Sequence, residues 1–122
     1  MHPDIARLQR IEEFDRLLAQ TFERPLLLFK HSLTCGTSAE ALDELIEHLN
    51  DDKLDVHYAI VTVQSHRELS SAVSARLGVR HETPQALLIH NGRVIWSASH
   101  FRVTGDAVEA AIRAHTQSSG AR

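Results

Sequence analysis

The residue in this sequence best suited to chemistry is Cys35, which opens the segment Cys35-Gly36-Thr37-Ser38. It is the one cysteine among the 122 residues. A single thiol excludes any intramolecular disulfide, so a secreted scaffold held together by disulfides is ruled out. Thiol–disulfide chemistry at Cys35 would therefore need a second sulfur from another molecule.

The surroundings of Cys35 favour a reactive thiol over a small buried structural cysteine, which is the alternative for a lone cysteine. A predicted strand ends and a predicted helix begins here, and the free N–H groups and dipole of a helix start stabilise a thiolate. Lys30 and His31 lie just upstream and could add positive potential. Ser38 stands where a two-cysteine redox motif carries its second thiol, and its hydroxyl could donate a hydrogen bond to a thiolate.

Thr83-Pro84 and His100 are the other candidates. Pro84 directly precedes a predicted strand, and on structural grounds alone it could be an ordinary trans loop proline. His100 falls just before the last predicted helix and, like His31, could border a pocket at Cys35. The nine histidines show no H-x3-H or H-E-x-x-H spacing, so we expect no metal site.

Hydrophobic periodicity and turn residues predict the elements that position these side chains. A first helix runs from about Ile11 and stops before Pro25, with Phe22 in its apolar stripe. A second helix from about Cys35 buries Ala39 and the apolar residues after it. The remaining predicted elements are strands at 25–29, 55–63, 86–90 and 94–98, a helix at 66–77 ended by Gly78, and a last helix opened by Thr104 and Asp106.

The order of these elements predicts an α/β fold of the thioredoxin type. Strand, helix and strand form a parallel pair with a right-handed crossover, and Asn91-Gly92 predicts a type I′ hairpin that adds an antiparallel half. We expect a four-stranded mixed sheet with helices on both faces, in a single domain spanning 1–122. Its core covers about 11–115, and the tail 116–122 is flexible. In this fold the proline before the third strand is cis and lies opposite the cysteine, so we predict a cis Thr83–Pro84 bond.

Composition narrows the partners. Thirteen Lys and Arg against 16 Asp and Glu give a formal net charge of −3, so nothing favours nucleic acid or an anionic membrane as partner. The N-terminus lacks the apolar run of a signal peptide, and no apolar stretch approaches the ~20 residues that span a bilayer. We expect a cytoplasmic protein that acts as a monomer or weak dimer.

Three groups of residues carry a resemblance that covers 11–115: Phe29-Lys30-His31-Ser32 with Thr34, Cys35 and Ser38; His81-Glu82-Thr83-Pro84-Gln85; and Trp96-Ser97-Ala98-Ser99-His100 with Thr104. With these residues the sequence resembles the YtxJ family, the monothiol bacilliredoxins of the bacillithiol system. The resemblance implies that Cys35 attacks a protein–bacillithiol mixed disulfide and takes the bacillithiol onto itself. A second low-molecular-weight thiol would then release it, with no bound cofactor.

On this interpretation Cys35 is the nucleophile, supported by Ser38 and Thr34. Substrate contacts are expected from Thr83, Pro84, His31, Lys30 and His100. Two alternatives stay open. Cys-Gly-x-Ser also resembles monothiol glutaredoxins, which hold an iron–sulfur cluster with glutathione, although their long insertion before the cysteine is absent. The third possibility is a redox-inert thioredoxin-like domain that only binds other proteins.

Overall fold

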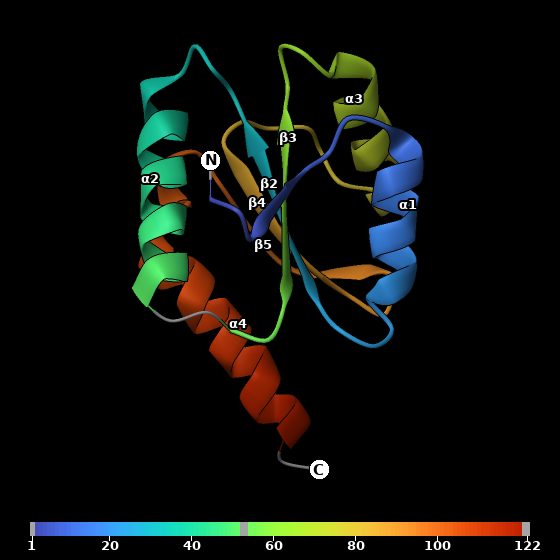
Figure 1. The fold of residues 1–122 in the computed structure, drawn as a ribbon, viewed down its shortest axis with the longest axis vertical. Coiled ribbons are helices and arrows are strands. Elements are labelled where there is room, and N and C mark those ends of the chain that lie inside the picture. Colours follow the sequence, from blue (N-terminus) through green and yellow to red (C-terminus); the bar gives the residue numbers. More distant parts are fainter. Residues whose placement is uncertain (1, 52–53, 121–122) are drawn as a thin grey trace.

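The computed structural model describes every residue except Met1, Asp52, Lys53, Ala121 and Arg122. It contains one five-stranded sheet with strand order β1-β3-β2-β4-β5 (Figure 1). The strands are β1 (Ile5–Arg7), β2 (Leu26–His31), β3 (His57–Thr62), β4 (Gln85–His90) and β5 (Arg93–Ser99). The helices are α1 (Ile11–Gln20), α2 (Gly36–Asp51), α3 (Arg67–Leu77), the short 3-10 helix η1 (His100–Arg102) and α4 (Gly105–Gly120).

The sheet is mixed, as predicted. β1 and β2 pair with β3 in parallel, whereas β4 runs antiparallel to both β2 and β5. All six residues of β2 are buried, because helices cover both sides of this central strand. Asn91 and Gly92 have φ values of 54° and 75°, so the hairpin turn between β4 and β5 has the predicted positive φ at both positions.

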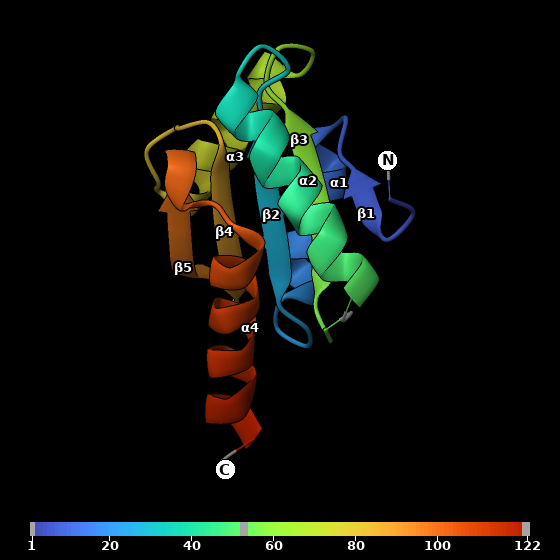
Figure 2. The same ribbon diagram turned by 90° about the vertical axis from the view of Figure 1, so that its left-hand side faces the viewer.

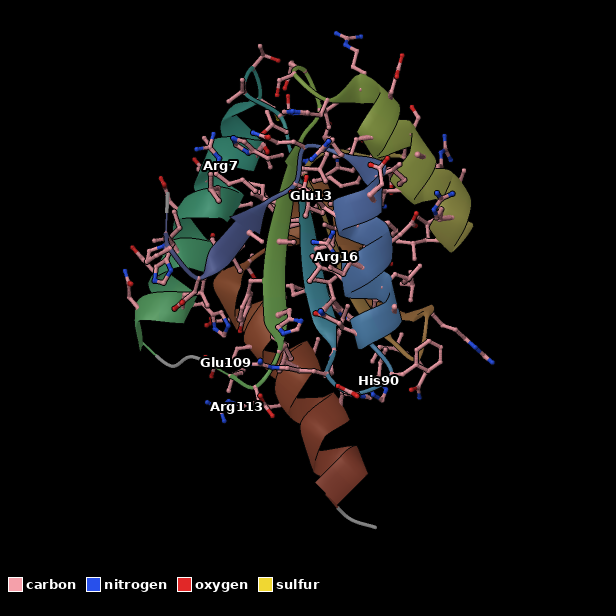
Figure 3. All side chains as sticks on the ribbon, turned by 45° about the vertical axis from the view of Figure 1, so that its right-hand side comes forward. Arg7, Glu13, Arg16, His90, Glu109 and Arg113 are labelled. Atoms are coloured by element: carbon pink, nitrogen blue, oxygen red, sulfur yellow. The ribbon has the colours of Figure 1, made fainter. Side chains whose placement is uncertain are left out.

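Helices cover the two faces in pairs, α2 and α4 on one side and α1 and α3 on the other (Figures 1 and 2). Each face of the sheet has its own hydrophobic core, and alternate residues of β2 pack into one core or the other. Leu27 and Phe29 pack with buried residues of α2 and α4, while Leu26 and Leu28 pack with those of α1 and α3. The same alternation places the side chains of the last two residues of β2 on opposite faces of the sheet.

The structure corrects four expectations. The sheet has five strands instead of four, because Ile5–Arg7 adds β1, and Ile5 extends the core to before residue 11. Three residues are too few to show a two-residue period. Phe22 lies beyond the end of α1 and is 66% exposed, next to the turn at Gly92. On α2, Ala39 was expected to be buried but is exposed, and Ala41 is the buried alanine instead.

The last helix, α4, extends past the lower end of the sheet (Figure 2). It packs on the sheet through Val108 and Ile112, both about 1% exposed. The tail predicted to be flexible, 116–122, overlaps the end of this helix, and its last two residues lie outside the described part of the chain.

Candidate active site

Cys35 stands at the start of α2, at the upper end of the sheet. Its carbonyl accepts the first helical hydrogen bond, from the Ala39 N–H at 3.1 Å, so Cys35 is the N-cap residue. The side chain is half-buried and unbridged, and within the described residues nothing hydrogen-bonds to Sγ. The thiol is thus within reach of solvent at a helix end that favours negative charge.

The turn before Cys35 is held by Gln64, from the segment after β3. Gln64 Nε2 donates to Ser32 Oγ at 2.7 Å and to Thr34 Oγ1 at 3.2 Å. Its Oε1 accepts from the Leu33 N–H at 3.0 Å. One amide side chain thus fixes three consecutive residues, and Thr34 takes part by shaping the turn. Sequence reasoning missed Gln64; its only signal is a polar residue at the carboxyl end of a parallel strand, where sites gather.

Ser38 is fully buried one turn into α2, and its hydroxyl is turned toward β2. Its Oγ accepts from the Ser32 N–H at 2.9 Å and lies 2.8 Å from His31 Nδ1. The expected hydrogen bond from Ser38 to the Cys35 sulfur is not formed, because the hydroxyl joins the end of β2 to α2 instead. Ser38 acts on Cys35 through the backbone it holds.

His31 is buried beside Ser38, on the side of the sheet that α2 covers. Its ring stacks on Phe29 with centroids 5.8 Å apart. Burial lowers the pKa of His31, so the ring is neutral near pH 7. It therefore supplies a hydrogen bond to the first turn of α2, and not the positive charge expected of it.

Lys30, the neighbour of His31, points to the opposite face. Its side chain is fully buried toward α3, with Nζ 2.6 Å from Ser74 Oγ and 2.8 Å from His81 Nδ1. The expectation that Lys30 contacts substrate or adds positive potential beside Cys35 is wrong, since alternation along β2 turns it away. Burial lowers its pKa to about 8.

The Thr83–Pro84 bond is cis, so this prediction is confirmed. Gln85 pairs with Lys30 in the β2–β4 ladder, and this register places Pro84 beside the end of β2 that leads to Cys35. Pro84 is buried and Thr83 half-buried. Both therefore lie at the same end of the sheet as the thiol.

His100 completes this end of the molecule. Its N–H donates to the Pro84 carbonyl at 2.8 Å, and its φ of 57° is left-handed, so the chain turns sharply here. Its Nε2 lies 3.3 Å from Glu82 Oε1, while Ser99 Oγ donates to Glu82 Oε2 at 2.7 Å. These two bonds, the one from Ser99 foremost, lower the pKa of Glu82. Glu82 was in the sequence resemblance without a role, and in the structure its carboxylate joins the loop before Pro84 to Ser99 and His100.

Exposed apolar side chains stand at this end too. Leu33, in the turn held by Gln64, is 67% exposed, and Phe101, next to His100, is 79% exposed. The site therefore combines one accessible thiol at a helix start, a cis-proline at the same end of the sheet and apolar groups open to a partner. That combination suits exchange of a sulfur with a disulfide brought by another molecule.

Known proteins agree with this geometry. A model of the monothiol bacilliredoxin family, BrxC, matches residues 6–108. The chain belongs to the monothiol bacilliredoxin family. It is thereby a thioredoxin-like redox protein with a single cysteine, as the resemblance in the sequence implied.

Solved structures show the same fold. A protein described as an oxidoreductase with a thioredoxin fold is 28% identical, with 88% of this chain and 93% of that chain covered and a TM-score of 0.78. Fasciola hepatica thioredoxin is 17% identical, covers 91% of this chain and 99% of its own, and has a TM-score of 0.73. A poplar thioredoxin h mutant is 14% identical, with coverages of 94% and 84% and a TM-score of 0.76. This bacilliredoxin therefore has the predicted thioredoxin fold.

Two further findings concern metals and membranes. Among the described residues, no group of three or more His, Cys, Asp or Glu side chains is arranged to hold a metal ion. Nor does that part of the chain contain a helix with the length and apolar character to cross a bilayer.

Proposed function

We propose that the protein removes bacillithiol, or a similar low-molecular-weight thiol, from mixed disulfides on other proteins, with Cys35 as the nucleophile. One observation carries this proposal: the N-cap residue of α2 carries an accessible thiol, while Ser38 fills the place of a second thiol. With one sulfur the protein can accept a small thiol but cannot expel it internally. A one-cysteine carrier is the mechanism that this arrangement allows.

The reaction consists of two disulfide exchanges. The Cys35 thiolate attacks the bacillithiol sulfur of the mixed disulfide, forming a Cys35–bacillithiol disulfide as the protein–bacillithiol bond breaks. The substrate protein leaves as a thiolate and takes a proton from water. A second small thiol then attacks the bacillithiol sulfur, which restores the Cys35 thiolate and yields a disulfide of the two small thiols. No net electrons come from the bacilliredoxin itself.

Substrate binding falls to the surface around Pro84. Thr83 precedes the cis-proline, and its backbone groups suit an extended segment of the substrate. His100 is exposed beside Pro84 and can reach the bound molecule. His31 lies buried behind this surface and acts by fixing α2, and Lys30 has no route to the substrate.

The proposed exchange reactions indicate the partners, the oligomeric state and the location of the protein. The protein partners are proteins that carry the small thiol, and each exchange needs one binding partner at a time, so we propose that a monomer or weak dimer suffices. Regeneration needs a pool of reduced small thiol, which supports a place in the cytoplasm.

The experiment that tests this proposal measures the loss of bacillithiol from a substrate protein. A bacillithiolated protein is incubated with the full chain and free bacillithiol, and its mass is measured over time. We expect the substrate to lose one bacillithiol with the wild type, to keep it with Cys35→Ser, and to lose it with Tyr58→Phe, a buried substitution that lies outside the site. A substrate that stays modified at stoichiometric wild-type protein would contradict the proposal.

A further inference from the structure

Lys30 is unusual because its ammonium is fully buried with no charge to balance it. Its Nζ donates to Ser74 Oγ at 2.6 Å and to His81 Nδ1 at 2.8 Å. Within the described part of the chain, no carboxylate pairs with it. Burying an uncompensated ammonium costs several kcal/mol, so an apolar side chain would suit a position that served packing alone.

The partners of Lys30 show what this cluster joins. Ser74 belongs to α3, whereas His81 belongs to the loop of residues 79–84 that connects α3 to β4. His81 Nδ1 also lies 3.4 Å from the Oγ of Ser70, one turn before Ser74 on α3. From β2, Lys30 thus reaches both the helix and the loop that ends at Pro84.

A second bond ties the same loop. Gln85 faces Lys30 in the β2–β4 ladder, and its Nε2 donates to the Arg80 carbonyl at 3.0 Å. The paired residues Gln85 and Lys30 thereby hold the loop at Arg80 and at His81, respectively. The segment between them and β4 is short and contains Glu82, Thr83 and Pro84.

We propose that Lys30 is a positioning residue that locks the 79–84 loop, through Ser74 and His81, in the arrangement that presents Thr83 and Pro84 to a mixed disulfide. This inference rests on the proposed function, in which Thr83 and Pro84 contact the substrate. Lys30 touches neither substrate nor Cys35, and acts through the loop.

The lock depends on the protonation of His81. A neutral imidazole can accept from the ammonium, whereas an imidazolium cannot and would repel it. Burial, followed by the charge of Lys30, lowers the pKa of His81, which keeps the lock closed at neutral pH. The groups that act on His81 are Lys30 from β2, the hydroxyl of Ser70 from α3, and Glu82 in the loop itself. The lock should therefore open as pH falls well below 6.5, the ordinary pKa of His81.

The first experiment measures the loop without any substrate. Amide hydrogen exchange, corrected for intrinsic rates, is compared in the full-length wild type and in Lys30→Met at pH 7. We expect about tenfold faster exchange confined to residues 79–84, together with a Tm equal to or above that of the wild type, since the uncompensated charge is gone. Tyr58→Phe is the matched control: it removes a buried hydrogen bond to His48 at 2.9 Å on the other face, and should leave exchange at 79–84 unchanged.

The second experiment measures binding in the Cys35→Ser background, which holds a bacillithiolated protein without turning it over. Lys30→Met should raise Kd about tenfold, in line with the loss of hydrogen bonds to a charged group. With Lys30 present, Kd should rise between pH 7 and pH 5. His81→Asn keeps an acceptor near Lys30 that does not titrate, so it should flatten this pH dependence while retaining binding at pH 7.

Two results would overturn the inference: unchanged exchange at 79–84 in Lys30→Met, or faster exchange throughout the sheet with a lowered Tm, which would mean a general packing role. A pH dependence of Kd that survives in His81→Asn would also count against it. If Cys35→Ser binds no mixed disulfide at all, the proposed function fails, and the exchange data still decide whether Lys30 locks the loop.

Discussion

Lys30 and His31 are adjacent and both buried, yet they serve opposite faces of the sheet with different chemistry. His31 is neutral and bonds to Ser38, which fixes the turn of α2 that begins at Cys35. Lys30 carries a charge and bonds to Ser74 and His81, which fix the loop before Pro84. The end of one strand thus contacts both halves of the proposed site, the start of α2 with Cys35 on one face and the loop before Pro84 on the other.

The comparison also separates two kinds of stabilisation. The His31 side is a neutral pair that should favour folding, whereas the Lys30 side holds an uncompensated charge that should oppose it. Removing the hydrogen bond on the His31 side should therefore lower the free energy of unfolding. Removing the charge on the Lys30 side should raise it.

The largest effect is expected from the charge of Lys30. Its pKa is about 8 when folded and near its ordinary 10.5 when unfolded, so between these values the unfolded chain binds more protons. The free energy of unfolding should therefore rise from pH 8 to pH 10.5, by about 3 kcal/mol in total. Urea titrations at several pH values measure this, with Lys30→Met as the subtracted control. A difference between wild type and Lys30→Met that does not change over this pH range would contradict the assigned penalty.

The opposite sign is expected for Ser38→Ala. Removing the buried hydroxyl leaves the Ser32 N–H and His31 Nδ1 without a partner, at a cost of about 2 kcal/mol in unfolding free energy. It should also change the rate at which Cys35 reacts with a thiol reagent, because the first turn of α2 loosens. Ser74→Ala is the matched serine on the other face, and should leave the reaction rate of Cys35 unchanged. Equal effects of both serines on that rate would break the comparison.

A smaller effect is expected from Gln64→Ala. Gln64 is partly exposed, so the loss of its three hydrogen bonds should cost about 1 kcal/mol in unfolding free energy. Its main consequence should be local, as faster amide exchange at residues 32–34 and an altered alkylation rate at Cys35. Gln64→Glu keeps the acceptor for Leu33 but loses the donor, and should lie between alanine and wild type. Unaltered exchange at 32–34 in Gln64→Ala would remove Gln64 from the site.

The smallest effect is expected from Glu82→Gln, which weakens the bonds to Ser99 and His100. The pKa of Glu82 is lowered below 4.5, so its carboxylate helps hold the folded state near neutral pH and loses that role as the pH falls through its folded-state pKa. The variant should therefore differ slightly from wild type in Tm at pH 7 and converge with it in strong acid. A difference that persists in acid would assign the effect to packing.

Much of this architecture is visible in the sequence. The order of elements, the turn at Asn91-Gly92 and the strand-to-helix junction at Cys35 rest on local signals, and the structure confirms them. β1 was not predicted because it spans three residues and is formed by pairing with the distant β3. Phe22 was misplaced because helical spacing continues past the residue where the helix ends.

The finer arrangement of the site depends on contacts between distant segments. β2 is buried on both faces, so its pattern does not reveal which way Lys30 and His31 point. Ser74 and His81 lie 44 and 51 residues after Lys30, and no spacing rule connects them. Gln64 bonds across about 30 residues for the same reason. Residue types could therefore be chosen from the sequence, but their partners could not.

The most direct test of the account is the fate of the Cys35 sulfur itself. The full chain is mixed with an equimolar bacillithiolated protein in the absence of free small thiol, and the Cys35 peptide is analysed by mass spectrometry. We expect one bacillithiol in disulfide linkage to Cys35, matched by an equal amount of freed substrate thiol. A substrate that is freed while Cys35 stays unmodified, or a Cys35 linked to the substrate protein in place of bacillithiol, would contradict it.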